Sequence, residues 1–166
     1  MTVREDRIAM AEVSGELTLD VMFEWLEKMP IPEGIRVEIV GGNIYMSPQR
    51  DTHWEIIRRV VRALEDKFGM QKSPEGYGQH QDVEFVAEVI SKGTAANDYG
   101  PKKAAYALAE VPVYVIADPH QGRCHVYTHP KGDDYATETK VAFGDDMDLT
   151  GTVVGLTLST ADFPRD

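Results

Sequence analysis

The stretch that decides the fold is DVEFVAEVISKGTAANDYGPKKAAYALAEVPVYVIADP, which occupies Asp82–Pro119. Its first part alternates apolar and polar residues and predicts a strand, and the polar residues Ser91–Asn97 predict a turn. An alanine-rich segment then predicts a short helix to about Ala109, with Asn97 or Asp98 as its cap and Pro101 in its first turn. The apolar run Val111–Ala117 is typical of a strand that is buried on both faces. A strand, a helix and a second strand in this order predict a βαβ unit.

Acidic residues are concentrated on one face of the first of these strands. Because side chains alternate between the two faces of a strand, Asp82, Glu84 and Glu88 project to the same side. Neighbouring carboxylates raise each other's pKa unless a cation lies among them, and Mg²⁺ binds one or two carboxylates while leaving positions for phosphate oxygens. Lys102, in the opening turn of the helix, would then hold the attacking water or the phosphate. The pattern indicates metal-assisted phosphodiester hydrolysis.

A plainer interpretation fits the same residues, and spacing alone favours it. In this interpretation Asp82 and Glu84 face solvent at the start of the strand. Glu88 is then a lone half-buried acid, and Lys102 is a surface residue of the helix.

The composition is that of a globular protein. The chain has 166 residues, of which 42% are hydrophobic and 27% charged, and this is enough for one domain with a sizeable core. We expect a single domain over residues 1–166, with the charged and aperiodic residues 1–16 flexible. The formal net charge of -11 repels polyanions at long range, so a nucleic-acid surface would have to be local, metal-assisted or supplied by a partner.

The cysteine content and the hydropathy indicate a cytoplasmic protein. Cys124 is the one cysteine, which excludes an internal disulfide and a thiolate metal cluster and fits a reducing compartment. No apolar run is long enough to cross a membrane, and the first residues lack the apolar core of a signal peptide. We therefore expect no membrane association.

Helical spacing of apolar residues predicts two helices ahead of the βαβ unit. The first runs over Thr18–Met29, with Thr18 as the N-cap and Pro30 after its end. The second and longest runs over Arg50–Phe68. His53 lies near its start, where a lone histidine is more often a capping or packing residue than a general base. Its apolar stripe comprises Trp54, Ile57, Val61, Leu64 and Phe68.

The other segments predict strands. Arg36–Val40 and Asn43–Ser47, joined by Gly41-Gly42, predict a β-hairpin. Within it Glu38 lies on the face opposite Val37 and Ile39, usually the solvent side, and becomes a candidate for a metal or for positioning water if that face meets a cleft. The order of elements indicates a mixed sheet flanked by helices. Further strands are expected over Arg123–His129, Tyr135–Phe143 and Thr152–Leu158, with an acidic turn at Gly144–Asp148.

A series of short motifs occurs along the chain in a specific order. They are Thr18–Leu26, VEIVGGNIYMSP at Val37–Pro48, His53, EVIS at Glu88–Ser91, Asp98 followed by Lys102 and Tyr106, VPVYVIADP at Val111–Pro119 and GLTLSTADF at Gly155–Phe163. Their order and spacing resemble the bacterial restriction endonuclease family of Uma type, in the PD-(D/E)xK nuclease superfamily, over most of the chain. The resemblance implies a restriction-endonuclease-like α/β fold and metal-dependent cleavage of DNA, with Mg²⁺ or Mn²⁺ as the cofactor.

The resemblance also implies roles for individual residues. Glu88 matches the metal-binding acid of the family's E-V-x-S strand, and the backbone carbonyl of Val89 is the neighbouring oxygen in such sites. Lys102 matches a lysine that has moved from the strand to the following helix, since Ile90 stands two positions after Glu88. Glu38 matches the acid of the family's hairpin and is implied to be catalytic together with Glu88 and Lys102. Supporting positions are implied for Asp98, the acid before the lysine, and for His53, the histidine of the long helix.

The chain departs from the family at one point. The family places a Pro-Asp pair, whose aspartate is the other principal metal ligand, on a strand before the Glu88 strand, whereas Met70–Gln81 has no aspartate and no strand pattern. Either a strand pair is lost, or the sequence has closed over a segment between residues 70 and 82. We favour the second, because deleting central strands orphans many backbone hydrogen bonds. If the loss is genuine, Asp82 or Glu84 would have to substitute.

These observations leave two functions open. The first is a Mg²⁺-dependent DNA endonuclease, which would act on both strands as a homodimer. The second is a catalytically degenerate nuclease-fold module for protein or nucleic-acid interaction. The acidic charge and the missing Pro-Asp pair favour the second.

Overall fold

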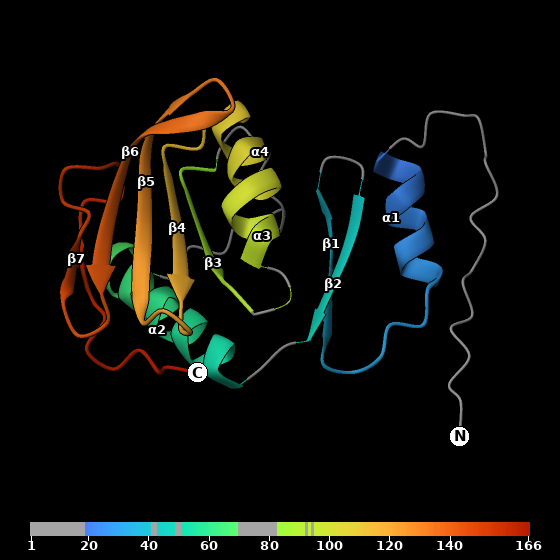
Figure 1. The fold of residues 1–166 in the computed structure, drawn as a ribbon, viewed down its shortest axis with the longest axis horizontal. Helices are drawn as coiled ribbons and strands as arrows, with labels where there is room; N and C mark the ends of the chain where they lie inside the picture. Colours follow the sequence, from blue (N-terminus) through green and yellow to red (C-terminus); the bar gives the residue numbers. More distant parts are fainter. Residues whose placement is uncertain (1–18, 41–42, 49–50, 70–82, 92, 94) are drawn as a thin grey trace. The chain divides into compact units, whose positions relative to one another are not determined.

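The structure, a computed structural model, describes residues 19–40, 43–48, 51–69, 83–91, 93 and 95–166 (Figure 1). These residues belong to two compact units, Met1–Pro30 and Ile31–Asp166. The helix α1, Leu19–Lys28, belongs to the first unit and confirms the predicted helix, whose proposed N-cap Thr18 lies outside the described residues. The expected flexibility of residues 1–16 also lies outside them, and the single domain stays a prediction.

A four-stranded mixed sheet forms the centre of the second unit (Figure 1). The strand β3, Phe85–Val89, pairs in parallel with β4, Val113–Asp118, as the predicted βαβ unit requires. The strands β5, Arg123–Lys131, and β6, Asp134–Ala142, continue the sheet in antiparallel order. The α/β fold with a mixed sheet flanked by helices is therefore confirmed.

Each face of this sheet is covered by a different helix. All six residues of β4 are buried, which explains why the first five, Val113–Ala117, form an unbroken apolar run. On one face, Ile56 and Val60 of α2, Asp51–Phe68, pack against the odd-numbered residues of β4. On the other face, Ala107 of α4, Lys103–Leu108, packs against Tyr114 and Ile116.

The helix α2 has nearly the predicted bounds, but its buried face differs from the predicted one. Trp54 and Phe68 are 60% and 52% exposed. His53, Ile56 and Val60 are buried, and of the predicted stripe Leu64 is half-buried against the same core. The centre of the packing face is therefore displaced toward the stripe one residue earlier, which lies about 100° around the helix. The cause is that apolar side chains occupy two adjacent stripes of this helix, and helical spacing alone does not tell which of them meets the sheet.

The segment between β3 and β4 is helical earlier than predicted. It consists of α3, Ala95–Asn97, a π-helical turn η2, Asp98–Lys102, and α4. The expected cap at Asn97 or Asp98 is wrong, because both residues lie within the helix. Pro101 is inside η2 rather than in the first turn. Proline has no N–H to donate to the carbonyl one α-helical turn earlier, and a widened π-helical turn accommodates this missing bond.

Two smaller antiparallel pairs complete the described residues. The strands β1, Ile35–Val40, and β2, Asn43–Pro48, form the predicted hairpin, whose Gly41-Gly42 turn lies outside the described residues. The strands β7, Asp146–Asp148, and β8, Thr157–Ser159, pair near the C-terminus. In place of the predicted acidic turn, Met147 is buried in the core while its two aspartate neighbours are exposed. In the part of the chain that is described, no helix could cross a membrane.

Candidate active site

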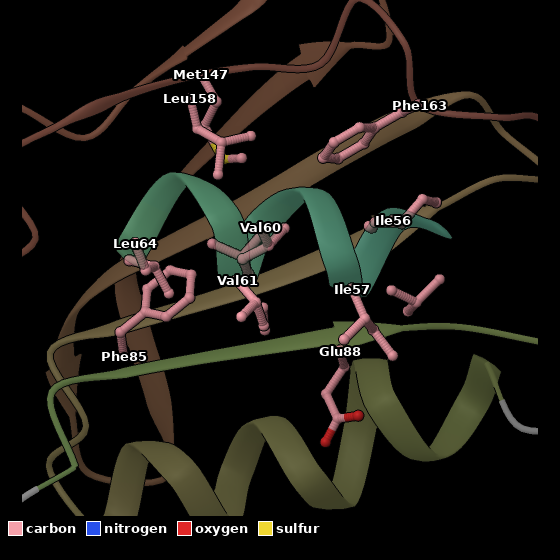
Figure 2. Close-up of a pocket in the computed structure, with 14 residues that line it drawn as sticks. Ile56, Ile57, Val60, Val61, Leu64, Phe85, Glu88, Met147, Leu158 and Phe163 are labelled. Atoms are coloured by element: carbon pink, nitrogen blue, oxygen red, sulfur yellow. The ribbon is translucent and has the colours of Figure 1, made fainter. Parts of the chain in front are cut away.

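Glu88 is a buried acid on the face of the sheet that α4 covers. Its side chain is 4% exposed. The neighbouring side chains of Ala87 and Val89 point to the opposite face, where they line an apolar cavity of about 190 Å³ between α2 and the sheet. Figure 2 shows the Glu88 carboxylate directed away from the apolar side chains of this cavity. The polar chemistry of Glu88 therefore belongs to the α4 side.

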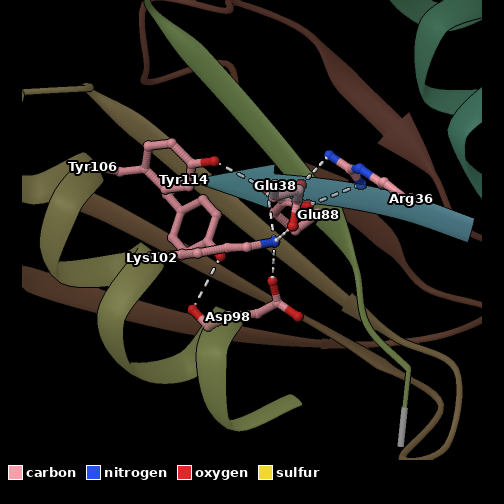
Figure 3. A network of polar contacts seen from close by, with 7 residues as sticks. All are labelled: Arg36, Glu38, Glu88, Asp98, Lys102, Tyr106 and Tyr114. Carbon is pink, nitrogen blue, oxygen red and sulfur yellow. Dashed lines mark hydrogen bonds and ion pairs between the residues drawn. The ribbon is translucent and has the colours of Figure 1, made fainter. Parts of the chain in front are cut away.

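Lys102 lies at the centre of a cluster of carboxylates on that side. The turn η2 directs Asp98 and Lys102 to the same buried position, where they are 3% and 5% exposed. The Lys102 Nζ lies 2.8 Å from Asp98 Oδ1 and 3.4 Å from Glu88 Oε1, and it also contacts Glu38 Oε2 (Figure 3). One ammonium group thus contacts three acids from three elements.

Arg36 joins the same cluster from the hairpin. Its Nη2 lies 2.5 Å from Glu38 Oε1, and its Nη1 donates a hydrogen bond of 3.4 Å to Glu88 Oε2. Sequence reasoning missed Arg36. The available signal was its position two residues before Glu38 in the same strand, because residues of equal parity share a face.

Two tyrosine hydroxyls donate hydrogen bonds to members of the cluster. The Tyr106 hydroxyl donates to Glu88 Oε1 at 3.0 Å, and the fully buried Tyr114 hydroxyl donates to the backbone carbonyl of Asp98 at 3.0 Å. Lys102 and Tyr106 share a face, as their spacing predicts. The role of Tyr114 was missed, although a tyrosine in an otherwise aliphatic buried strand requires a partner for its hydroxyl.

Burial and charge compete in setting the protonation of these groups. Burial raises the pKa of Asp98 to about 6, against the lowering effect of Lys102. Burial lowers the pKa of Lys102, but the attraction of Glu88, Asp98 and Glu38 is larger in sum and raises it above the ordinary value. Lys102 is therefore a cation at neutral pH. Burial, with Glu88 nearby, raises the pKa of both Tyr106 and Tyr114, so these hydroxyls remain neutral donors.

The structure brings four of the predicted site residues together, namely Glu88, Lys102, Glu38 and Asp98. The burial of Lys102 and its contact with Glu88 show that the plainer interpretation of these two residues is wrong.

The other candidates lie elsewhere or remain predictions. The strand β3 begins at Phe85, three residues later than predicted, so Glu84 precedes it and is exposed. His53 lies on the buried face of α2, the helix that packs on the other side of the sheet. A metal-binding role of the Val89 carbonyl stays a prediction. Asp82 and the segment 70–82, where the Pro-Asp strand was expected, lie outside the described residues.

The cluster contains carboxylate oxygens, the type of ligand that Mg²⁺ takes in proteins. Glu38 and Glu88 each direct one oxygen toward Arg36 and the other toward Lys102, so their carboxylates converge. Mg²⁺ requires one or two carboxylates and completes its shell with water and phosphate oxygens. Among the residues that the structure describes, no group of three or more His, Cys, Asp or Glu side chains is arranged as a metal site. A metal held here would therefore depend on the carboxylate pair.

The mixed sheet and the buried acid–lysine cluster define an α/β protein of the restriction-endonuclease-like class. A family model described as Uma2, putative restriction endonuclease, matches residues 71–161, which is more than half of the chain. The chain belongs to this family. The family connects it with a nuclease-type function on nucleic acid. The match includes Glu88, Asp98 and Lys102 but not the hairpin with Arg36 and Glu38. No curated protein matches the chain.

Proposed function

We propose that this protein is a metal-dependent DNA endonuclease that hydrolyses phosphodiester bonds with Mg²⁺ or Mn²⁺. The observation that carries the proposal is the contact of Lys102 with both Glu38 and Glu88 in a buried cluster, in a chain of the Uma2 family. Convergent carboxylates can hold a metal ion, and a lysine beside them suits phosphodiester hydrolysis. Positive charge favours deprotonation of the attacking water and stabilises the negative charge that develops on the phosphate.

Each residue of the cluster has a part in this mechanism. Glu88 and Glu38 would hold the cation, with the Val89 carbonyl as the neighbouring oxygen that the family implies. The bound cation would supply Lewis-acid polarisation of the scissile phosphate. The Lys102 ammonium stabilises the charge that develops on the phosphate or holds the attacking water, and Asp98 fixes the lysine by an ion pair of 2.8 Å. Tyr106 orients the Glu88 carboxylate.

DNA as the partner must overcome the net charge of -11. The helix α2, on the face of the sheet opposite the cluster, carries Arg58 and Arg62, which are exposed and offer positive charge to phosphate groups other than the scissile one. Cleavage of both DNA strands favours a homodimer. The single cysteine, Cys124, is buried in β5 as a free thiol, which suits the reducing cytoplasm. These three features belong to the proposal.

The test is nicking of supercoiled plasmid by the purified protein with Mg²⁺, with Mn²⁺ and with EDTA. Glu88→Gln keeps the size of the side chain but removes its charge, so we expect nicking to fall by about 10²-fold or more. Lys102→Ala should lose nicking as well and is compared at a temperature where its thermal unfolding has not begun. The matched control is Glu84→Gln, because this acid is exposed and lies just before the same strand.

The proposal fails if Glu88→Gln nicks as fast as the wild type, or if EDTA leaves the rate unchanged. Either result would show that the observed nicking does not come from this cluster.

A second candidate function is a non-catalytic module for protein or nucleic-acid interaction. The observation that favours it is that both oxygens of Glu88 already have partners, with Arg36 on one and Tyr106 and Lys102 on the other. Crystals soaked in Mn²⁺ distinguish the two functions. Ordered metal beside Glu88 supports the nuclease, and a cluster that remains as described here supports the module.

A further inference from the structure

One guanidinium group links the two acids that would hold the metal. Arg36 contacts Glu38 Oε1 at 2.5 Å through Nη2 and Glu88 Oε2 at 3.4 Å through Nη1 (Figure 3). The two acids come from β1 and β3, so this bridge also joins the hairpin to the central sheet. A planar guanidinium can occupy two carboxylates at once, whereas an ammonium is a point charge.

Arg36 differs from Lys102 in how firmly the protein holds it. The Arg36 side chain is 41% exposed, whereas that of Lys102 is 6% exposed. The Arg36 guanidinium is already partly hydrated and can move fully into water, whereas a departing Lys102 would leave three acids without their shared cation. Of the two cations in the cluster, Arg36 is the one that can be exchanged.

The balance of charges in the cluster also indicates that Arg36 can be exchanged for a divalent cation. Glu38, Glu88 and Asp98 face the two cations Arg36 and Lys102. If Arg36 leaves, the three acids keep only Lys102, and the two oxygens that it releases are on Glu38 and Glu88. Buried or half-buried carboxylates require such compensation, which a divalent cation supplies.

We propose that Arg36 is an exchangeable counter-ion that occupies the carboxylate pair in the metal-free protein and competes with the divalent cation for it. This inference rests on the proposed function, because it assigns the same two acids to the metal. In the metal-free state Arg36 holds the hairpin to the sheet, and metal binding releases its guanidinium from Glu38 and Glu88.

The experiment measures metal affinity directly, without activity. Mn²⁺ is titrated into the full chain, and the dissociation constant is obtained by calorimetry and by the electron paramagnetic resonance signal of free Mn²⁺. Because Arg36→Gln removes the competitor, we expect it to bind Mn²⁺ about 5- to 50-fold more tightly than the wild type. Arg36→Lys keeps the charge but not the bridge, so its affinity should fall between the two.

The matched control is Arg59→Gln. Arg59 is similarly exposed, at 36%, and also contacts two carboxylates, Glu55 at 2.7 Å and Asp162 at 3.2 Å, outside the cluster. This change alters the net charge as much as Arg36→Gln does, so it corrects for any long-range effect of charge on Mn²⁺ affinity. We expect Arg59→Gln to bind Mn²⁺ within about 2-fold of the wild type.

Thermal unfolding provides a second measurement. Without metal Arg36→Gln should melt below the wild type, because the two acids lose a partner, and saturating Mn²⁺ should raise its Tm by more than it raises that of the wild type. If Arg36→Gln does not fold, Arg36→Lys is compared with the wild type in both measurements.

Two results would overturn the inference, and they are distinguishable. If the wild type binds Mn²⁺, Glu88→Gln does not, and Arg36→Gln binds no more tightly than the wild type, Arg36 is not a competitor but the metal site of the proposed function stands. If the wild type does not bind Mn²⁺, or Glu88→Gln binds it equally well, the metal site fails together with the inference.

Discussion

The buried ammonium of Lys102 determines how the acids of the cluster are held. Its three carboxylate contacts outweigh the loss of hydration, as the raised pKa of Lys102 indicates. Asp98 shows the opposite balance, because burial raises its pKa to about 6 despite the ion pair with Lys102. The two partners of this ion pair are thus not equivalent: as the pH falls through about 6 Asp98 becomes neutral, whereas Lys102 remains a cation.

Stability should therefore depend on pH through Asp98. Its pKa is about 6 in the folded protein and 3.8 as an ordinary value. The folded state binds this proton more tightly, so the contribution is fully present below about pH 4 and is lost as the pH rises through 6. The pKa difference corresponds to roughly 1–3 kcal/mol. Asp98→Asn, which mimics the neutral acid, should flatten the free energy of unfolding between pH 4 and about 6 in urea titrations.

The control for this prediction is Asp162→Asn, since Asp162 is exposed and its ion pair with Arg59 lies outside the cluster. The prediction is wrong if the pH dependence of Asp98→Asn equals that of the wild type over this interval.

The sequence predicts those site residues whose type and position already suggest a chemical role. Glu88 and Lys102 became candidates because acids share one face of the strand and a lysine opens the next helix, and the family resemblance favoured them over the plainer interpretation. Arg36 and Tyr114 were not identified, because their roles depend on contacts across 52 and 16 residues of chain. Such contacts follow from how the elements pack, which local patterns do not determine.

The π-helical turn η2 is the element that positions the lysine. The backbone carbonyl of Asp98, in this turn, accepts a hydrogen bond from the Tyr114 hydroxyl. This bond fixes the turn to β4. The sequence predicted a helix here but not this turn, because Pro101 also fits the first turn of a regular helix. The starting point of the helix, Ala95, whose N–H donates to Ser91 O, decides between the two.

Tyr114→Phe should therefore reduce nicking because η2, and with it Lys102, is held less precisely, not because a reacting group is removed. The loss of its hydrogen bond leaves the Asp98 carbonyl without this donor, which costs about 1–2 kcal/mol. A displacement of Lys102 by a fraction of an ångström should slow nicking by about 10-fold. Thermal melts and plasmid nicking measure the two effects.

Tyr135→Phe provides the matched comparison. The Tyr135 hydroxyl also donates to a buried backbone carbonyl, that of Val111, at 3.0 Å, and its ring lies in the same core as Tyr114. We expect a similar loss of stability without loss of nicking. Equal loss of nicking in both variants would mean that Tyr114 acts only through the stability of the core.

At the scale of the whole molecule, the site is assembled from distant parts of one unit. The βαβ unit supplies Glu88 and Lys102, and its strands and helices were largely predictable because its hydrophobic pattern is strong. Glu38 comes from the hairpin, and no local pattern indicates that the hairpin faces η2. The order of elements in the sequence thus predicts the fold class, whereas the completion of the site depends on tertiary packing.

Both core clusters and the polar cluster consist of residues from Ile31–Asp166. A fragment of residues 31–166 should therefore fold, with a Tm within about 5 °C of the full chain, and should retain nicking and Mn²⁺ binding. The opposite truncation, which removes only Thr160–Asp166, should be far more damaging. It deletes Phe163 from the core and the fully buried Thr160, whose hydroxyl bonds to the backbone of Ala142 and Asp145. Circular dichroism melts of both fragments decide the matter, and an unfolded 31–166 fragment would show that the first unit is required for the stability of the second.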